Sequence, residues 1–279
     1  MHRIAVISDV HGNVTALKAV IADARQAHCT DFWYLGDLFV PGPGAHDLLA
    51  LLDELPITAY LRGNWEDGLL ETLAGKIDPH DPSDVYESWI DDYVHDHLTA
   101  ADVTRIRHLP MVQTLTLDGL TFQLTHNLPD RNSGQTLSPE GDQTGFDQLA
   151  RGGADVMVYG HVHHQLMRQS TAGQLIVNPG TVGMPFPHWG RFAQDLRAQY
   201  AIITTQGRRM PNVTFRQVAY DAATEIALAR SRQLPYADLY ADQLTTGHVY
   251  THDLPALTRV TQRPGEAARL RQLLAKYAN

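Results

Sequence analysis

Short polar motifs that directly follow apolar segments are the part of this sequence that could do chemistry. They combine carboxylates, imidazoles and an amide, which suit divalent cations such as Mn, Fe, Zn or Ni. A carboxylate shared by two such cations can hold them about 3.5–4 Å apart, the spacing found in two-metal hydrolases. In chain order the motifs are Asp9-Val10-His11-Gly12-Asn13, Gly36-Asp37, Gly63-Asn64, Thr125-His126 and Gly160-His161-Val162-His163.

Each motif taken alone has an ordinary structural explanation. The Asp9 motif could be a turn whose carboxylate caps a helix, and the two-residue motifs could be simple turns. The pair His161 and His163 is a sharper signal, because side chains two positions apart converge on a metal only where the strand has ended. Five such motifs, each at a predicted strand end, favour one shared site over five unrelated turns.

The elements that must position these motifs alternate between strand and helix in the first part of the chain. Short apolar runs predict buried parallel strands at 4–8, 32–35 and 57–61, with helices at 14–27 and 45–55 between them. Parallel strands joined by helices bind ligands in a crevice at their carboxyl ends. The first three motifs are therefore expected to face the same crevice.

The rest of the chain predicts a second sheet and two helical additions. Residues 65–108 are predicted to be a helical cap insertion, and Asp118-Gly119 indicates a tight hairpin. The remaining strands, expected to complete the second sheet, are 112–117, 120–125, 155–159, 166–169, 175–177, 200–205 and 213–219. The predicted fold class is α/β: a mixed two-sheet β-sandwich with helices outside.

Two regions are expected along the chain. Residues 1–220 form the domain that carries the motifs, and residues 221–279 form a C-terminal helical extension with helices at 221–233 and 266–277. This extension could pack back on the core, cover the mouth of the site or form an oligomer contact. The sequence does not decide among these roles, and homo-oligomer formation stays open.

Composition excludes several classes of protein and of partner. The single cysteine, Cys29, excludes an intramolecular disulfide. No apolar run is long enough to span a bilayer, and the first residues lack the pattern of a signal peptide, so a cytoplasmic protein is expected. The net charge of −9 argues against stable nucleic-acid binding, which depends on clustered Lys and Arg. Bound cations would have to attract any anionic substrate.

The ordered set of motifs resembles the calcineurin-like metallophosphoesterase superfamily. The stretch from Ser8 to Asn13 with Leu17 and Val20, together with Asn178-Pro179-Gly180-Thr181-Val182-Gly183, is similar to its small prokaryotic phosphodiesterase-like branch. The similarity covers roughly residues 3–220. It implies direct hydrolysis of a phosphate ester by a metal-bound hydroxide, and no covalent nucleophile is needed.

The resemblance also implies roles for individual residues. Asp9, His11 and His163 would bind the first metal, Asp37 would bridge the two, and Asn64, His126 and His161 would bind the second. Catalytic roles are expected for Asp37, Asn64 and His163. The cofactors implied are two divalent metal ions, with manganese one of several candidates.

The sequence departs from the family pattern at Trp65. Many relatives have a histidine after the asparagine, and it is thought to protonate the leaving oxygen, whereas an indole N–H only donates a hydrogen bond. Either His164 or His188 supplies the proton, or the substrate has a good leaving group, or activity is low. Because relatives that lack this histidine are often described as phosphodiesterases, small phosphodiesters are the favoured substrates.

Two other functions stay open at this point. The first is a phosphomonoesterase, including a protein phosphatase, and the second is a weakly active regulatory protein that binds metal and nucleotide. The substrate is expected to be a small phosphate ester, including nucleotide-derived ones, because aromatic residues in the loop 185–189 could stack on a base. The predicted substrate contacts are Asn64, Trp65, Arg62 and His188, although Arg62 could equally form a structural ion pair.

Overall fold

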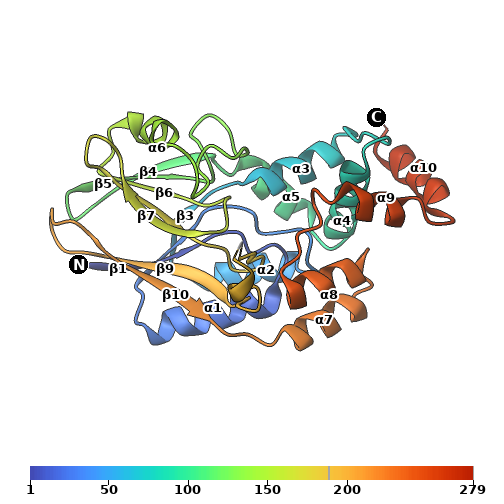
Figure 1. Ribbon diagram of the computed structural model, residues 1–279, viewed down its shortest axis with the longest axis horizontal. Helices are drawn as coiled ribbons and strands as arrows, with labels where there is room; N and C mark the ends of the chain where they lie inside the picture. Colours follow the sequence, from blue (N-terminus) through green and yellow to red (C-terminus); the bar gives the residue numbers. More distant parts are fainter. Residues whose placement is uncertain (188, 279) are drawn as a thin grey trace.

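Two five-stranded sheets lie face to face and helices cover their outer faces (Figure 1). This computed structural model describes residues 1–187 and 189–278. The first sheet has the strand order β10-β9-β1-β2-β3. Its strands are β1 (His2–Ile7), β2 (Asp31–Tyr34), β3 (Ile57–Tyr60), β9 (Ala198–Thr205) and β10 (Asn212–Val218). Strands β1, β2 and β3 run parallel, as the alternation with helices predicts.

The second sheet has the order β4-β5-β6-β8-β7 and is also mixed. Strands β4 (Val112–Leu117) and β5 (Leu120–Thr125) form the predicted hairpin, β5, β6 and β8 run parallel, and β7 returns antiparallel to β8. The other strands are β6 (Val156–Tyr159), β7 (Gln165–Gln169) and β8 (Leu175–Pro179). The predicted fold class, a mixed two-sheet sandwich flanked by helices, is confirmed.

One part of the predicted topology is wrong. Strands β9 and β10 were expected in the second sheet, but β9 pairs antiparallel with β1, with Ile4 opposite Ile203, and β10 pairs with β9. Both strands therefore extend the first sheet. A local pattern of alternating side chains fixes that a segment is a strand, but it does not fix which sheet edge the strand joins.

The interior of the sandwich is apolar and contains side chains from both sheets. Trp33 from β2 meets Phe122 from β5, with ring centroids 5.2 Å apart in an edge-to-face arrangement. The outer face of the first sheet is covered by α1 (Val14–Gln26) and α2 (His46–Asp53), and α6 (Gln143–Leu149) covers the second. Short 3₁₀ turns occur at Ala150–Gly152 and Gly190–Phe192.

The insertion and the C-terminal segment are helical and gather at one end of the sandwich, on the right of Figure 1. The insertion forms α3 (Asn64–Leu73), α4 (Pro82–Asp96) and α5 (Ala100–His108). The C-terminal segment forms α7 (Ala222–Ser231), α8 (Ala237–Thr246), α9 (Leu254–Thr261) and α10 (Glu266–Tyr277). Helix α4 packs against α3, α9 and α10. The sequence analysis did not predict α8 and α9.

The C-terminal segment packs back on the motif-bearing part of the chain. The buried Glu225 of α7 accepts hydrogen bonds from the backbone N–H groups of Val14 and Thr15, at the first turn of α1. Apolar side chains of α7, α8 and α9 also belong to the core under the first sheet. The division of the chain at residue 220 stays a prediction.

Within the described residues, no helix combines the length and apolar character needed to cross a membrane.

Candidate metal centre

The polar motifs meet at one end of the two sheets, because each follows a strand that ends there. Asp9 and His11 follow β1, Asp37 follows β2, and Asn64 begins α3 after β3. From the second sheet, His126 follows β5, and His161 and His163 follow β6. Five of these residues adopt a left-handed backbone conformation, which residues other than glycine seldom adopt. Their φ angles are 57° at Asp9, 52° at His11, 60° at Asp37, 67° at His161 and 57° at His163.

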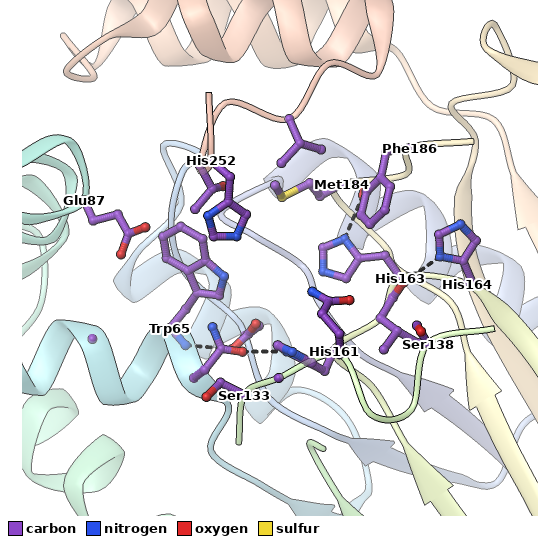
Figure 2. A pocket seen from close by; sticks show the side chains of 18 of the residues that line it. Trp65, Glu87, Ser133, Ser138, His161, His163, His164, Met184, Phe186 and His252 are labelled. Atoms are coloured by element: carbon purple, nitrogen blue, oxygen red, sulfur yellow. Dashed lines mark hydrogen bonds between the residues drawn. The ribbon is translucent and has the colours of Figure 1, made fainter. Parts of the chain in front are cut away.

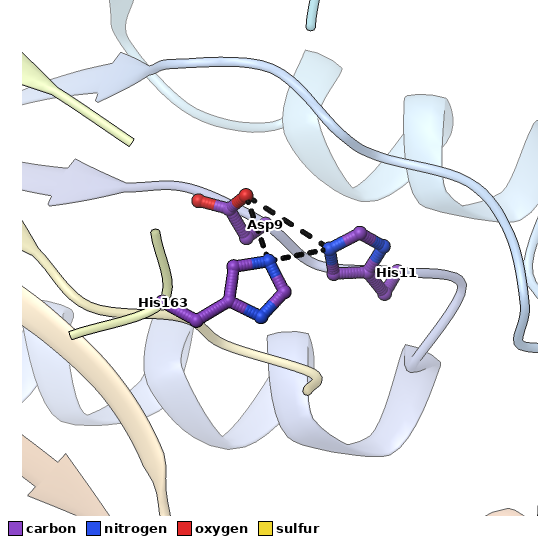
Figure 3. Close-up of side chains that lie close together, drawn as sticks. All are labelled: Asp9, His11 and His163. Carbon is purple, nitrogen blue, oxygen red and sulfur yellow. Dashed lines mark hydrogen bonds and ion pairs between the residues drawn. The ribbon is translucent and has the colours of Figure 1, made fainter. Parts of the chain in front are cut away.

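Asp9, His11 and His163 form the first group of converging ligand atoms (Figure 3). The Nε2 atom of His163 lies 3.1 Å from Asp9 Oδ1 and 2.9 Å from His11 Nε2. All three side chains are buried. The backbone N–H of His161 donates to the other oxygen of Asp9 at 3.2 Å, so Oδ1 is the oxygen turned toward the imidazoles.

Asp37, His126 and His161 form the second group, together with Asn64. His126 Nε2 lies 3.2 Å from Asp37 Oδ2 and 3.0 Å from Asn64 Oδ1. His161 Nδ1 lies 2.8 Å from Asn64 Oδ1. The Asp37 Oδ2 atom is also 3.9 Å from His11 Nε2 in the first group, so this carboxylate lies between the two groups.

Backbone carbonyl groups fix the orientation of three of the four imidazoles. The Nδ1–H groups of His11, His126 and His163 donate to the carbonyl oxygens of Val40, Leu35 and Met184, at 2.7, 2.8 and 2.9 Å. In the neutral rings the Nε2 lone pairs therefore point into the centre, the arrangement that metal-binding histidines adopt.

The donor set fits divalent cations on a further ground. Within the described residues, Asp9 Oδ1 and Asp37 Oδ2 are buried and accept no hydrogen bond. The Nε2 atoms of His11 and His163 lie 2.9 Å apart, and in the neutral rings their lone pairs face each other. Lone pairs and carboxylate charge concentrated in a buried space repel one another, and positive charge among them removes the repulsion.

The pKa shifts of the ligand side chains in the metal-free protein also indicate that the centre favours positive charge. Burial raises the pKa of Asp9, but His163 and the other imidazoles outweigh it and hold this pKa below its usual range. Burial opposes protonation of His126, yet the Asp37 carboxylate raises the pKa of His126 to about 10. Burial and the nearby His163 lower the pKa of His11 to about 4. A proton on His126 balances the carboxylates when no cation does.

Glu66 holds together the two loops that carry Asp37 and Asn64. Its carboxylate, 1% exposed, accepts the backbone N–H groups of Asp37, Leu38 and Gly63 at 2.9, 2.7 and 2.8 Å. The sequence analysis gave Glu66 no role. The signal was present, since a glutamate at the third position of a helix often accepts hydrogen bonds at the helix start.

A cavity of about 740 Å³ opens beside the two groups of predicted metal ligands (Figure 2). Four of the predicted ligands line it, namely Asp37, Asn64, His161 and His163, and these include the three expected to be catalytic. The other walls come from α3, α4, the loop 133–140 and two loops near the C-terminal helices. They include Trp65, Glu87, Asp91, Glu140, His164, Phe186, Val249 and His252.

The predicted substrate contacts do not all line the cavity. Trp65 lines the cavity with its ring edge-on to His11, at a centroid distance of 5.6 Å. Arg62 does not line this cavity, because its Nε atom pairs with Asp67 at 2.6 Å, so the structure favours the ion pair over a phosphate contact. His188 lies outside the described residues. His164 lines the cavity, and its Nδ1–H donates to the Val162 carbonyl at 2.6 Å.

The sequence analysis missed the cavity residues that lie far from the motifs, including Glu87 and Asp91 on α4 and His252 before α9. No motif marks them, and only the packing of α4 and α9 around the site brings them together.

Comparisons with known proteins agree with the fold and identify the family. The model of the calcineurin-like phosphoesterase superfamily domain matches residues 2–208. A metallophosphoesterase from Sphaerobacter thermophilus is 25% identical, with 88% of this chain and 100% of that chain covered and a TM-score of 0.64. A hypothetical protein from Pyrococcus horikoshii is 17% identical, with 89% and 99% covered and a TM-score of 0.72, which shows the shared fold alone. No curated protein matches the chain.

Proposed function

Because the chain belongs to the calcineurin-like phosphoesterase superfamily, we propose that it hydrolyses small phosphodiesters with two divalent cations bound at the centre described above. The observation that supports this most directly is the pair of buried carboxylate oxygens of Asp9 and Asp37, which lie 3.1 and 3.2 Å from imidazole nitrogens and have no hydrogen-bond partner among the described residues. Asp9, His11 and His163 would hold one cation, and Asn64, His126 and His161 the other, with Asp37 shared.

The residues of the centre have separate tasks in this proposal. Divalent cations held by these residues would activate water for attack on phosphorus and would neutralise charge on the phosphoryl oxygens. Asn64 turns its amide oxygen toward the two imidazoles, so its amide nitrogen is the donor left for a phosphoryl oxygen. Asp37 is oriented by the backbone N–H of Trp65, which donates to its Oδ1 atom at 2.9 Å.

The charge balance of the cavity favours a diester over a monoester. A phosphate monoester carries close to two negative charges at neutral pH, whereas a diester carries one. Within the described residues, neither Lys nor Arg lines the cavity, so only the bound cations would balance the substrate's charge. The indole N–H of Trp65 donates hydrogen bonds but does not protonate a leaving group, so His164 stays the predicted source of that proton among the described residues.

The size and walls of the cavity suit a small organic diester. About 740 Å³ lies within the range of small-molecule binding sites. We include nucleotide-derived diesters in the substrate class, because the aromatic side chains of Trp65 and Phe186 line the same cavity.

The test compares bis-p-nitrophenyl phosphate with p-nitrophenyl phosphate, using the purified protein loaded with Mn²⁺ and the same protein after treatment with a chelator. The expected result is metal-dependent hydrolysis with kcat/KM at least about tenfold higher for the diester. A preference for the monoester would instead support a phosphomonoesterase. Bound metal without hydrolysis of either ester would support the regulatory binding protein that Trp65 suggests.

A further inference from the structure

Two carboxylates face the cavity from helix α4, apart from the metal ligands. Glu87 and Asp91 are one helical turn apart, so their side chains lie on the same face of the helix. Both line the cavity, and Figure 2 shows the Glu87 carboxylate directed toward Trp65. Like charges at this spacing repel each other, so the pair destabilises the helix unless positive charge or protons compensate.

Asp91 gives the stronger indication that a ligand binds at this wall. Its side chain is 2% exposed, and its Oδ2 atom accepts a hydrogen bond from Thr72 Oγ1 at 2.7 Å. Within the described residues, its Oδ1 atom has no hydrogen-bond partner. A buried carboxylate oxygen left in this state costs free energy that a donor would recover. Glu87 is half-buried and accepts no hydrogen bond from the described residues.

The electrostatic environment of Glu87 and Asp91 also favours a cationic ligand. Burial, together with the charge of Asp91, raises the pKa of Glu87 to about 8, and burial raises the pKa of Asp91 to about 7. No Lys or Arg among the described residues lines the cavity to compensate. Lys76 lines a neighbouring depression that Glu87 and Asp91 also border, but its ammonium pairs with Glu71, at 3.4 Å. On the side that faces the cavity, the α4 wall is therefore acidic and, among the described residues, has no Lys or Arg beside it.

An organic cation fits this wall better than a metal ion. Among the described residues, only two groups of three ligand side chains converge closely enough to hold a metal, and neither contains Glu87 or Asp91. An unpartnered oxygen also needs an N–H or O–H donor, which a primary ammonium group has and a quaternary ammonium group lacks. Trp65, Met184 and Val249 line the same cavity and would contact the carbon chain that carries it.

We propose that Glu87 and Asp91 form a subsite for a primary ammonium group carried on one ester arm of the substrate. The inference rests on the proposed function for the position of the phosphodiester, which would lie at the metal centre. The substrate class is thus a zwitterionic phosphodiester, with its phosphate at one wall of the cavity and its ammonium at another.

The experiment uses two matched series of ligands on the Mn²⁺-loaded protein. The first compares kcat/KM for p-nitrophenyl ω-aminoalkyl phosphates of increasing chain length with that for p-nitrophenyl n-alkyl phosphates. The second measures, by calorimetry, the affinity of ω-aminoalkyl phosphates, their trimethylammonium analogues and n-alkyl phosphates, which requires no catalysis. The variants are Glu87→Gln and Asp91→Asn. Asp96→Asn is the control, because it makes the same charge change on α4 outside the cavity.

We expect the wild type to prefer the primary amine by at least about tenfold in both series at the best chain length. Glu87→Gln and Asp91→Asn should each remove most of this preference, so that kcat/KM for the aminoalkyl diester falls toward the value that the same variant shows for the n-alkyl diester. Asp96→Asn should keep the preference.

The outcomes separate this inference from the proposed function. Hydrolysis of n-alkyl diesters without any preference for the amine would overturn the subsite and leave the phosphodiesterase proposal standing. An affinity preference that depends on Glu87 and Asp91, without hydrolysis of any ester, would uphold the subsite and overturn the proposed function. An equal gain from the trimethylammonium analogues would reject recognition of a primary ammonium.

Discussion

Replacing Glu66 by Gln should loosen the centre without touching a predicted metal ligand. The glutamate carboxylate accepts three backbone N–H groups, two at Oε2 from Asp37 and Gly63 and one at Oε1 from Leu38. Glutamine keeps the shape but has a single acceptor oxygen. If that oxygen takes the place of Oε2, the new NH₂ group faces the Leu38 N–H, and a buried donor loses its acceptor.

The size of the effect follows from this count. One buried N–H without an acceptor costs about 1–3 kcal/mol. Burial and the Asp37 charge raise the pKa of Glu66 to about 7, so above that pH the two remaining hydrogen bonds change from charge-assisted to neutral, which weakens each by roughly half. Together these effects predict a loss of about 2–4 kcal/mol in the free energy of unfolding. Because the affected loops carry Asp37 and Asn64, affinity for metal at the second group should fall by about 10–100-fold.

The assay is urea unfolding of metal-free protein in the presence of a chelator, followed by Mn²⁺ titration of the refolded protein. Glu71→Gln is the matched control on α3, since Glu71 is exposed and pairs only with Lys76 among the described residues. It should change stability by less than about 0.5 kcal/mol. If Glu66→Gln matched this control in both stability and metal affinity, the structural role assigned to Glu66 would be wrong.

Two further predictions concern packing and charge. Gly63→Ala should abolish metal binding at the second group, because an added Cβ would lie 2.7 Å from the Asp37 backbone nitrogen. Gly68→Ala is the control and should keep metal binding, because no atom lies within 4 Å of the position of its added Cβ. Metal analysis of both variants checks this. Asp23→Asn should lower the free energy of unfolding by about 1–2 kcal/mol at pH 7, since Asp23 accepts two hydrogen bonds from Arg216. These hydrogen bonds lower the pKa of Asp23 from 3.8. The difference in free energy of unfolding between variant and wild type is therefore present above pH 3.8 and should shrink as the pH falls below it. Unfolding curves measured across this pH range would detect the change.

The sequence predicted the parts of the molecule that local patterns determine. Asparagine is a preferred residue at helix starts, and the side chain of Asn13, just before the first helix, accepts the backbone N–H of Ala16. The motif residues come together because each follows a strand, and strand ends were predictable from apolar runs. By contrast, β9 and β10 were placed in the wrong sheet, since pairing between distant strands leaves no local pattern.

Other features depend on tertiary packing or lack a local signal. Helix α8 begins after Tyr236, which adopts a left-handed backbone and forms no side-chain cap, so no start signal marked it. Glu87 and Asp91 read as ordinary exposed positions of a polar helix until α3 and α9 pack around α4. The roles assigned to the metal-ligating residues stay predictions that experiments on the ligands themselves must decide.

The most direct test of the central claim is the metal content and the bis-p-nitrophenyl phosphatase activity of Asp37→Asn beside wild type. Asp37 lies between both groups of ligands, and an amide cannot replace a carboxylate shared by two cations. We predict that wild type binds two metal ions per chain and that the variant loses at least one, with activity falling by at least about 100-fold. A variant with unchanged activity and metal content would contradict a two-metal centre built around Asp37.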